Sequence, residues 1–108
     1  MSKERITRGS GNVFADLGMP DAGERQTKTR LAMAINEIIA SRKLRQVDAA
    51  KVLNIPQPRV SALLHYRLKE FSVEKLLDLL TRLDQDVEIM IRPRAREGSG
   101  AVSVLTVR

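Results

Sequence analysis

Residues 46–65, QVDAAKVLNIPQPRVSALLH, decide the fold of this 108-residue chain. Apolar residues recur at helical spacing in both halves of this stretch, which predicts two short helices joined by a tight turn. Asn54 stands at the joint, where a positive φ is needed and asparagine is the best choice after glycine. Pro56 and Pro58 suit the start of the second helix, because the first turn of a helix leaves its N–H groups unbonded. Such a pair presents its second helix to the DNA major groove; a helical hairpin with no DNA role is the alternative.

This stretch resembles the helix-turn-helix of the Cro/C1-repressor (XRE) family. Gln46 matches the glutamine that opens the family's second helix and binds a phosphate. Gln57 matches the one that opens the recognition helix and reads a base. Asn54 and Pro56 depart from the family pattern, standing where a glycine and a serine or threonine cap are common. Residues Ala50, Val60 and Leu63 match the family's internal packing positions.

The order of parts over residues 11–93 resembles the HigA-like antitoxins of bacterial toxin–antitoxin operons. GNVFADLGMPDA is followed by a long helical pattern, the motif, FSVEKLLDLL and DVEIMIRP. The resemblance implies a small toxin as partner, typically a messenger-RNA-cleaving ribonuclease. It also implies that the protein represses the operon that encodes both proteins.

Composition bounds the class of protein. The length supports one domain with a small core, and the scarcity of aromatic residues leaves aliphatic side chains to fill it. The chain has no cysteine and one histidine, which excludes disulfides and cysteine-based zinc sites. No apolar run approaches the roughly 20 residues that span a bilayer, and no signal-peptide pattern opens the chain. We therefore expect a soluble, intracellular protein with no membrane partner, and the resemblance to antitoxins implies the cytoplasm of a bacterium.

The formal net charge of +6 is unevenly distributed. Residues 25–70 hold ten basic and three acidic groups, whereas residues 1–24 have a net charge of −1 and residues 71–108 are neutral. The excess positive charge therefore lies on the helix-turn-helix and on the helix before it. This placement favours contact with a polyanion over a general role in solubility.

The fold that we expect is all-α, with five helices in an XRE-type helix-turn-helix domain and a C-terminal β-strand or hairpin used for dimerisation. Residues 1–12 should be a flexible tail, 13–84 the helical DNA-binding domain, and 85–108 a β-element and tail. The first helix is a short turn carrying Val13, Phe14 and Leu17. The second runs from about Asp21 to Arg42, and a helix capped by Ser72 follows the motif.

The expected dimer interface lies near the C-terminus. Val87, Ile89 and Ile91 alternate with Glu88 and Met90, which predicts a strand, and Leu79 is expected beneath it. A lone strand is marginal in water, so pairing with a second copy of the chain would satisfy it. Residues 101–107 form a second β-prone run, for which pairing within the chain, pairing with a partner and disorder all remain open.

The DNA-contacting residues follow from the faces of the second motif helix and from the positive charges beside it. Glutamine can pair with adenine, arginine with guanine, and an alanine methyl can meet a thymine methyl. The candidate base-reading residues are Gln57, Arg59, Ser61 and Ala62. The candidate phosphate-contacting residues are Lys43, Arg45, Gln46, Arg67 and Lys69.

Catalysis is not expected. Ser61 and His65 share a helical face, but no carboxylate is placed to orient the imidazole. Asp84, Asp86 and Glu88 match no metal-binding loop, so we expect no cofactor and no metal. The sequence thus predicts a dimeric repressor that binds operator DNA, and the resemblance to HigA-like antitoxins implies that it acts as the antitoxin of a ribonuclease toxin. A stand-alone phage or metabolic repressor is the alternative, and a sequence-indifferent nucleoid protein is a third class.

Overall fold

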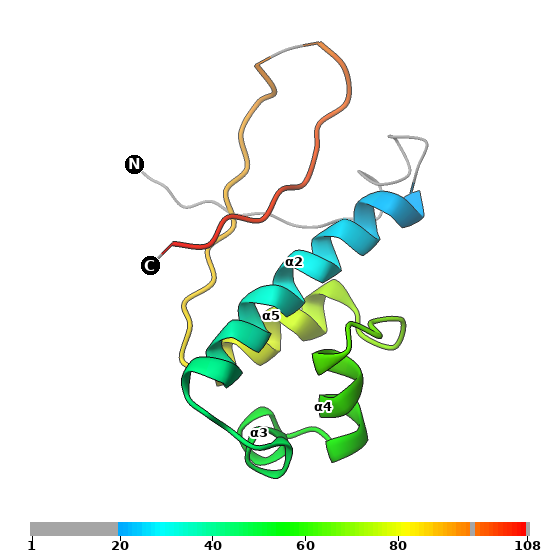
Figure 1. Cartoon of the computed structure of the whole chain (residues 1–108). Helices are drawn as coiled ribbons and strands as arrows, with labels where there is room; N and C mark the ends of the chain where they lie inside the picture. The colour runs from blue at the N-terminus through cyan, green and yellow to red at the C-terminus, as the bar shows by residue number, and fades with distance from the viewer. Residues whose placement is uncertain (1–19, 96, 108) are drawn as a thin grey trace.

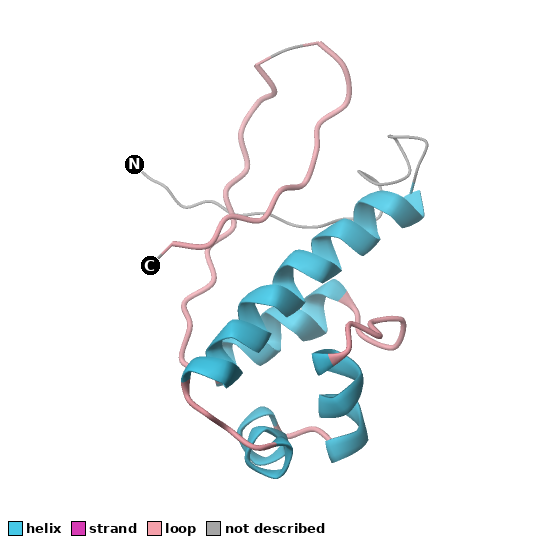
Figure 2. Ribbon diagram, in the orientation of Figure 1, coloured by secondary structure: helices cyan, strands magenta, loops and turns pink. Residues whose placement is uncertain are grey.

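A computed structural model describes residues 20–95 and 97–107 of the chain. This part holds four helices, whose arrangement is drawn in Figure 1, and loops make up the remainder of it (Figure 2). They are α2 (Pro20–Ser41), α3 (Gln46–Leu53), α4 (Gln57–Leu64) and α5 (Val73–Arg82). None of these helices is long and apolar enough to cross a membrane.

Helices α2 and α5 pack side by side, and the pair of α3 and α4 packs against them (Figure 1). The contact follows from their patterns, because each helix carries apolar residues on one face. Leu31, Ile35 and Ile39 of α2 are buried, as are Leu76 and Leu79 of α5. Together with residues of α3, α4 and the connecting segments they make one core. Its remaining members are Ala32, Ala34, Ala49, Leu53, Ile55, Val60, Leu63, Leu68, Phe71, Val73, Leu80 and Leu83.

Helix α5 begins at a side-chain cap, as the sequence predicts. The Ser72 Oγ accepts a hydrogen bond from the backbone N–H of Lys75 at 3.0 Å, which pairs one of the N–H groups that a helix leaves unbonded. Glu74 adds a negative charge in the first turn, where the helix dipole favours it.

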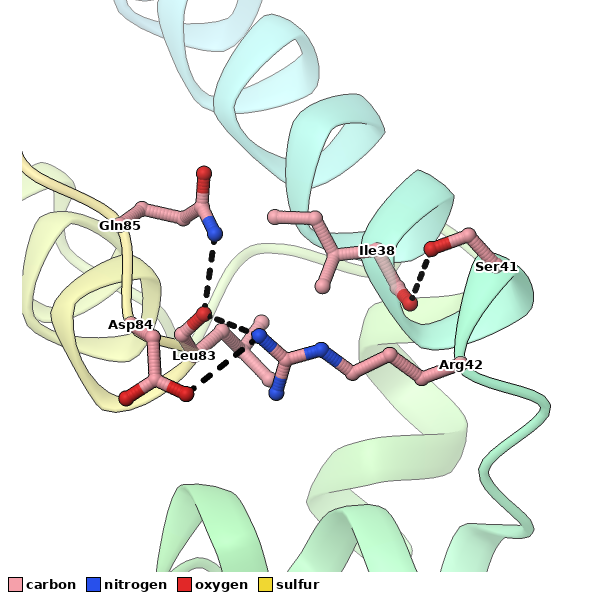
Figure 3. A network of polar contacts seen from close by, with 6 residues as sticks. All are labelled: Ile38, Ser41, Arg42, Leu83, Asp84 and Gln85. Carbon is pink, nitrogen blue, oxygen red and sulfur yellow. Dashed lines mark hydrogen bonds and ion pairs between the residues drawn. The ribbon is translucent and has the colours of Figure 1, made fainter.

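Polar contacts fasten the end of α2 to the end of α5 (Figure 3). The Arg42 guanidinium donates through Nη2 to the Leu83 carbonyl at 2.7 Å and lies 3.5 Å from the Asp84 carboxylate. The Gln85 amide donates to the same carbonyl at 3.0 Å. A charged donor on a helix C-terminal carbonyl is favourable, because that end of the helix dipole is negative. These contacts hold the point at which the C-terminal segment leaves the helices.

The prediction of five helices with a C-terminal strand or hairpin is wrong. The described residues contain four helices and no strand. The short helix expected around Val13, Phe14 and Leu17 lies outside these residues. Alternation along Val87 to Ile91 does indicate extended backbone, but a strand also requires a neighbour to receive its hydrogen bonds. The second β-prone run does not supply that ladder, so the hairpin option for residues 101–107 is also wrong.

The C-terminal residues instead run out from the helices and return toward them (Figure 1). Val87 on the outgoing part and Val104 on the returning part are partly buried against the core. Val102, Ser103 and Val104 border a hollow whose opposite wall is formed by α2. The segment is therefore attached to the domain through individual apolar side chains.

Candidate nucleic-acid interface

The turn between α3 and α4 has the backbone that the sequence predicts. Asn54 adopts the left-handed conformation, with φ of 57° and ψ of 48°. The N–H of Ile55 donates to the Ala50 carbonyl at 3.1 Å, so the last turn of α3 is closed in the manner of a Schellman motif. Ile55 itself is buried in the angle between the two helices. Pro56 is extended, with ψ of 149°, and α4 begins immediately after it. The helix-turn-helix prediction is confirmed at this level.

Helix α4 has one buried face and one open face. Val60 and Leu63 are fully buried, whereas Gln57 and Pro58 at its start are exposed. Ser61 and Ala62 are half-buried, and Ala62 packs in part against the core. The open face therefore begins with Gln57 at the N-terminal end of the helix. That end is the one through which a recognition helix commonly contacts base edges.

Arg59 lies on the flank of α4 and contacts the segment that leads to α5. Its guanidinium carbon is 5.5 Å from the centre of the Phe71 ring, and its Nη1 is 3.5 Å from the Glu70 carbonyl oxygen. Stacking over an aromatic face attracts a cation because the ring carries negative charge on its faces. In this conformation Arg59 connects α4 to the segment before α5 and does not extend away from the protein.

The candidate phosphate-contacting residues on the N-terminal side of α4 differ in how far they are engaged. Lys43 is exposed in the turn after α2, with φ of 57°, and Gln46 is half-buried at the first position of α3. Arg45 is bound to Asp48, with 2.9 Å between Nε and Oδ2 and 3.2 Å between Nη2 and Oδ1. This hydrogen bond is the main reason why the pKa of the Asp48 carboxyl lies below its ordinary value, and it also raises the pKa of Arg45. A phosphate would therefore have to compete with Asp48 for Arg45.

The segment after α4 supplies two further exposed cations, Arg67 and Lys69. The Arg67 backbone N–H donates to the Ala62 carbonyl at 2.8 Å, so the start of this segment is closed against the last turn of α4. The His65 Nδ1 lies 2.8 Å from the Ser61 carbonyl oxygen. Exposed cations thus follow α4 directly in the chain.

Sequence reasoning missed one polar contact of α4. Asn36 lies off the apolar stripe of α2, where helical spacing predicts a surface residue. It is instead half-buried, and its Nδ2 donates to the Leu63 carbonyl of α4 at 3.0 Å. The partner is 27 residues away in the chain, so no local pattern could have revealed it.

The four predicted dimer residues divide into two groups. Leu79 is fully buried in the core of its own chain and presents no surface. Val87 and Ile89 are half-buried, whereas Ile91 is 74% exposed. Met90 beside it is 62% exposed. The structure therefore leaves an apolar surface on the outgoing C-terminal segment and none at Leu79.

No cluster of three or more potential metal ligands occurs in the part of the chain that the structure describes. The chemistry of this site is that of hydrogen-bond donors, acceptors and cations displayed on a short helix and beside it.

Comparison with known proteins assigns the class. Residues 13–92 match the family described as a helix-turn-helix domain, which covers most of the chain. A solved structure assigned to the XRE family of transcriptional regulators is similar with a TM-score of 0.78 and 53% sequence identity, covering 82% of this chain and 100% of that one. No curated protein is significantly similar in sequence. The chain therefore belongs to the XRE family of helix-turn-helix transcriptional regulators.

Proposed function

We propose that this protein is a sequence-specific repressor that reads operator DNA with α4. The observation that carries the proposal is the division of α4 into a buried face and an open face that begins at Gln57. A side-chain amide at this end can make two hydrogen bonds to one adenine, which few other side chains can do. Ser61 and Ala62 would contact neighbouring bases at closer range.

Arg59 has two roles in this proposal. In the free protein it stacks on Phe71, and on DNA it releases the ring and the Glu70 carbonyl to pair with a guanine. The stacking is a weak contact at a half-buried position, so a bidentate pair with guanine would replace it with a stronger one. Lys43, Arg67 and Lys69 would bind phosphates on either side of the groove, and Gln46 would add a neutral phosphate contact.

The protein is proposed to act as a homodimer, because one recognition helix covers only a half-site. Ile89 and Ile91, with the neighbouring Met90, are the proposed contact with the second copy. Their support is the exposure of Met90 and Ile91 in a single chain, since exposed apolar side chains in adjacent positions gain stability when a partner covers them. Val87 would hold the segment to its own core.

The proposed biological role is that of an antitoxin which neutralises a ribonuclease toxin and represses the operon that encodes both proteins. The order of sequence parts over residues 11–93 supports it, and the cytoplasm of a bacterium is the compartment it implies. Co-expression with the protein encoded by the neighbouring reading frame tests this role. If that protein does not inhibit growth, or if this chain does not relieve the inhibition, the stand-alone repressor replaces the antitoxin.

DNA reading is tested with duplexes that the wild-type protein enriches from a random-sequence library. Gln57→Ala should weaken binding to the enriched duplex by roughly 1–3 kcal/mol and leave binding to random DNA almost unchanged. Arg67→Ala should weaken both and lower the slope of log K against log salt concentration by about 0.9. Fluorescence anisotropy measures both quantities, and Gln26→Ala, at an exposed glutamine of α2, is the matched control.

Equal affinity of the wild-type protein for enriched and random DNA would contradict sequence-specific reading and favour a nucleoid protein. An unchanged preference in Gln57→Ala would mean that another face of the molecule reads the bases.

A further inference from the structure

Asn36 connects the C-terminal half of α2 to the last turn of α4. Its Nδ2 donates to the Leu63 carbonyl oxygen at 3.0 Å. A carbonyl oxygen only accepts hydrogen bonds, so the amide nitrogen must be the atom that faces it. The other amide atom, Oδ1, is buried and has no hydrogen-bond partner among the described residues.

The buried Oδ1 of Asn36 lowers the stability of the fold, a cost that an apolar side chain at this position would avoid. A buried acceptor without a partner loses its hydration and gains nothing in exchange. The Leu63 carbonyl also accepts the Tyr66 backbone N–H at 3.1 Å, so it does not depend on Asn36 for a partner. Stability alone therefore does not explain an asparagine at position 36. The property that the hydrogen bond adds is a defined direction between α2 and α4.

Direction matters because the fully buried side chains of α4 are apolar, and Arg59 makes its contacts with the segment before α5 and not with α2. Val60 and Leu63 pack through their side chains, and apolar burial is not directional. A hydrogen bond weakens steeply when its angle or length changes, so it restricts the rotation of the helix. We propose that Asn36 is a positioning residue for DNA recognition, which fixes the orientation of α4 relative to α2. This inference rests on the proposed function of α4.

The length of α4 turns a small tilt into a large displacement at its reading end. Asn36 holds the C-terminal end, and Gln57 lies at the other end of the eight-residue helix. A tilt of about 10° about the C-terminal end of a helix about 12 Å long moves the N-terminal end by about 2 Å. Hydrogen bonds to a base tolerate only about 0.5 Å. Contacts of long, flexible cationic side chains with phosphates tolerate far more, so base reading should suffer first.

Two substitutions of Asn36 separate positioning from stability. Asn36→Leu has nearly the same shape and removes both the donor and the unpaired Oδ1, so its melting temperature should equal or exceed that of the wild type. Asn36→Ala removes the same atoms but leaves space, so it should melt lower. Met33→Leu, at an exposed position of the same helix, is the control. All are measured as full-length protein by thermal unfolding and by anisotropy on the enriched and random duplexes.

Both variants are expected to lose the same discrimination despite their opposite stabilities. The ratio of Kd for random DNA to Kd for the enriched duplex should fall about tenfold, the loss of one well-placed base contact. Affinity for random DNA should not change, and Met33→Leu should match the wild type. The proposal is overturned if Asn36→Leu keeps the wild-type ratio. It is also overturned if affinity for both duplexes falls together in step with the melting temperature. A wild-type protein that enriches no sequence would instead refute the proposed function, before any variant is measured.

Discussion

Leu63→Ala tests the buried face of α4, on which both the fold and the presentation of its open face depend. The Leu63 side chain is fully buried, so the substitution removes three carbon atoms from the core. At about 0.8 kcal/mol for each buried methylene-sized group, the transfer cost is about 2.4 kcal/mol. A cavity that does not collapse adds more, which gives a total of about 2.5–4 kcal/mol, within the range of roughly 2–5 measured for such substitutions.

That loss is a large part of the stability of so small a domain, which is expected to be about 5–15 kcal/mol. Urea unfolding followed by circular dichroism measures it, and the midpoint should fall with little change in slope. Leu105→Ala is the matched control, because the same three carbons are removed from a side chain that is 85% exposed. A shift for Leu63→Ala no larger than that for Leu105→Ala would refute the packing of α4 onto the core.

Three further predictions concern single local interactions. Ser72→Ala removes the hydrogen bond to the Lys75 N–H and should cost about 1 kcal/mol in thermal unfolding, whereas Ser72→Thr should keep most of it. Asn54→Ala should cost about 1 kcal/mol because of the left-handed backbone, and Asn54→Gly should not be less stable than the wild type; the reverse order would contradict the conformation of the turn. The hydrogen bond with Arg82 is the main cause of the lowered pKa of Asp78. The stability that it contributes should therefore be present above the unfolded aspartate pKa of about 3.9 and should be lost as the pH falls through the lowered pKa of the folded protein. The difference in unfolding free energy between the wild type and Asp78→Asn, measured from pH 7 to pH 2, should therefore shrink only at the acidic end.

Local rules were enough to predict the helix-turn-helix. The left-handed Asn54 follows from the tight turn between the two helices, and the buried faces of α3 and α4 follow from helical periodicity, so each depends on residues within a few positions. The same holds for the Ser72 cap.

Contacts between distant segments were not predictable in the same way. Strand pairing at Val87 to Ile91 needed a second segment in register, and alternation in one segment carries no information about another. Helical spacing places Asn36 off the apolar stripe because periodicity describes a helix in isolation, whereas the hydrogen-bond partner of Asn36 belongs to α4. Arg59 illustrates the same limit, since its stacking on Phe71 depends on how the segment before α5 returns past α4.

The two faces of α4 have a consequence for how the family can diversify. Gln57 and Pro58 contribute no side chain to the core, whereas Val60 and Leu63 contribute theirs completely. Substitutions on the open face therefore cost little folding free energy, and under the proposed function new target sequences would be accessible without passing through unstable intermediates. Within one eight-residue helix, the positions that the fold requires are thus separate from the positions that can change without loss of stability.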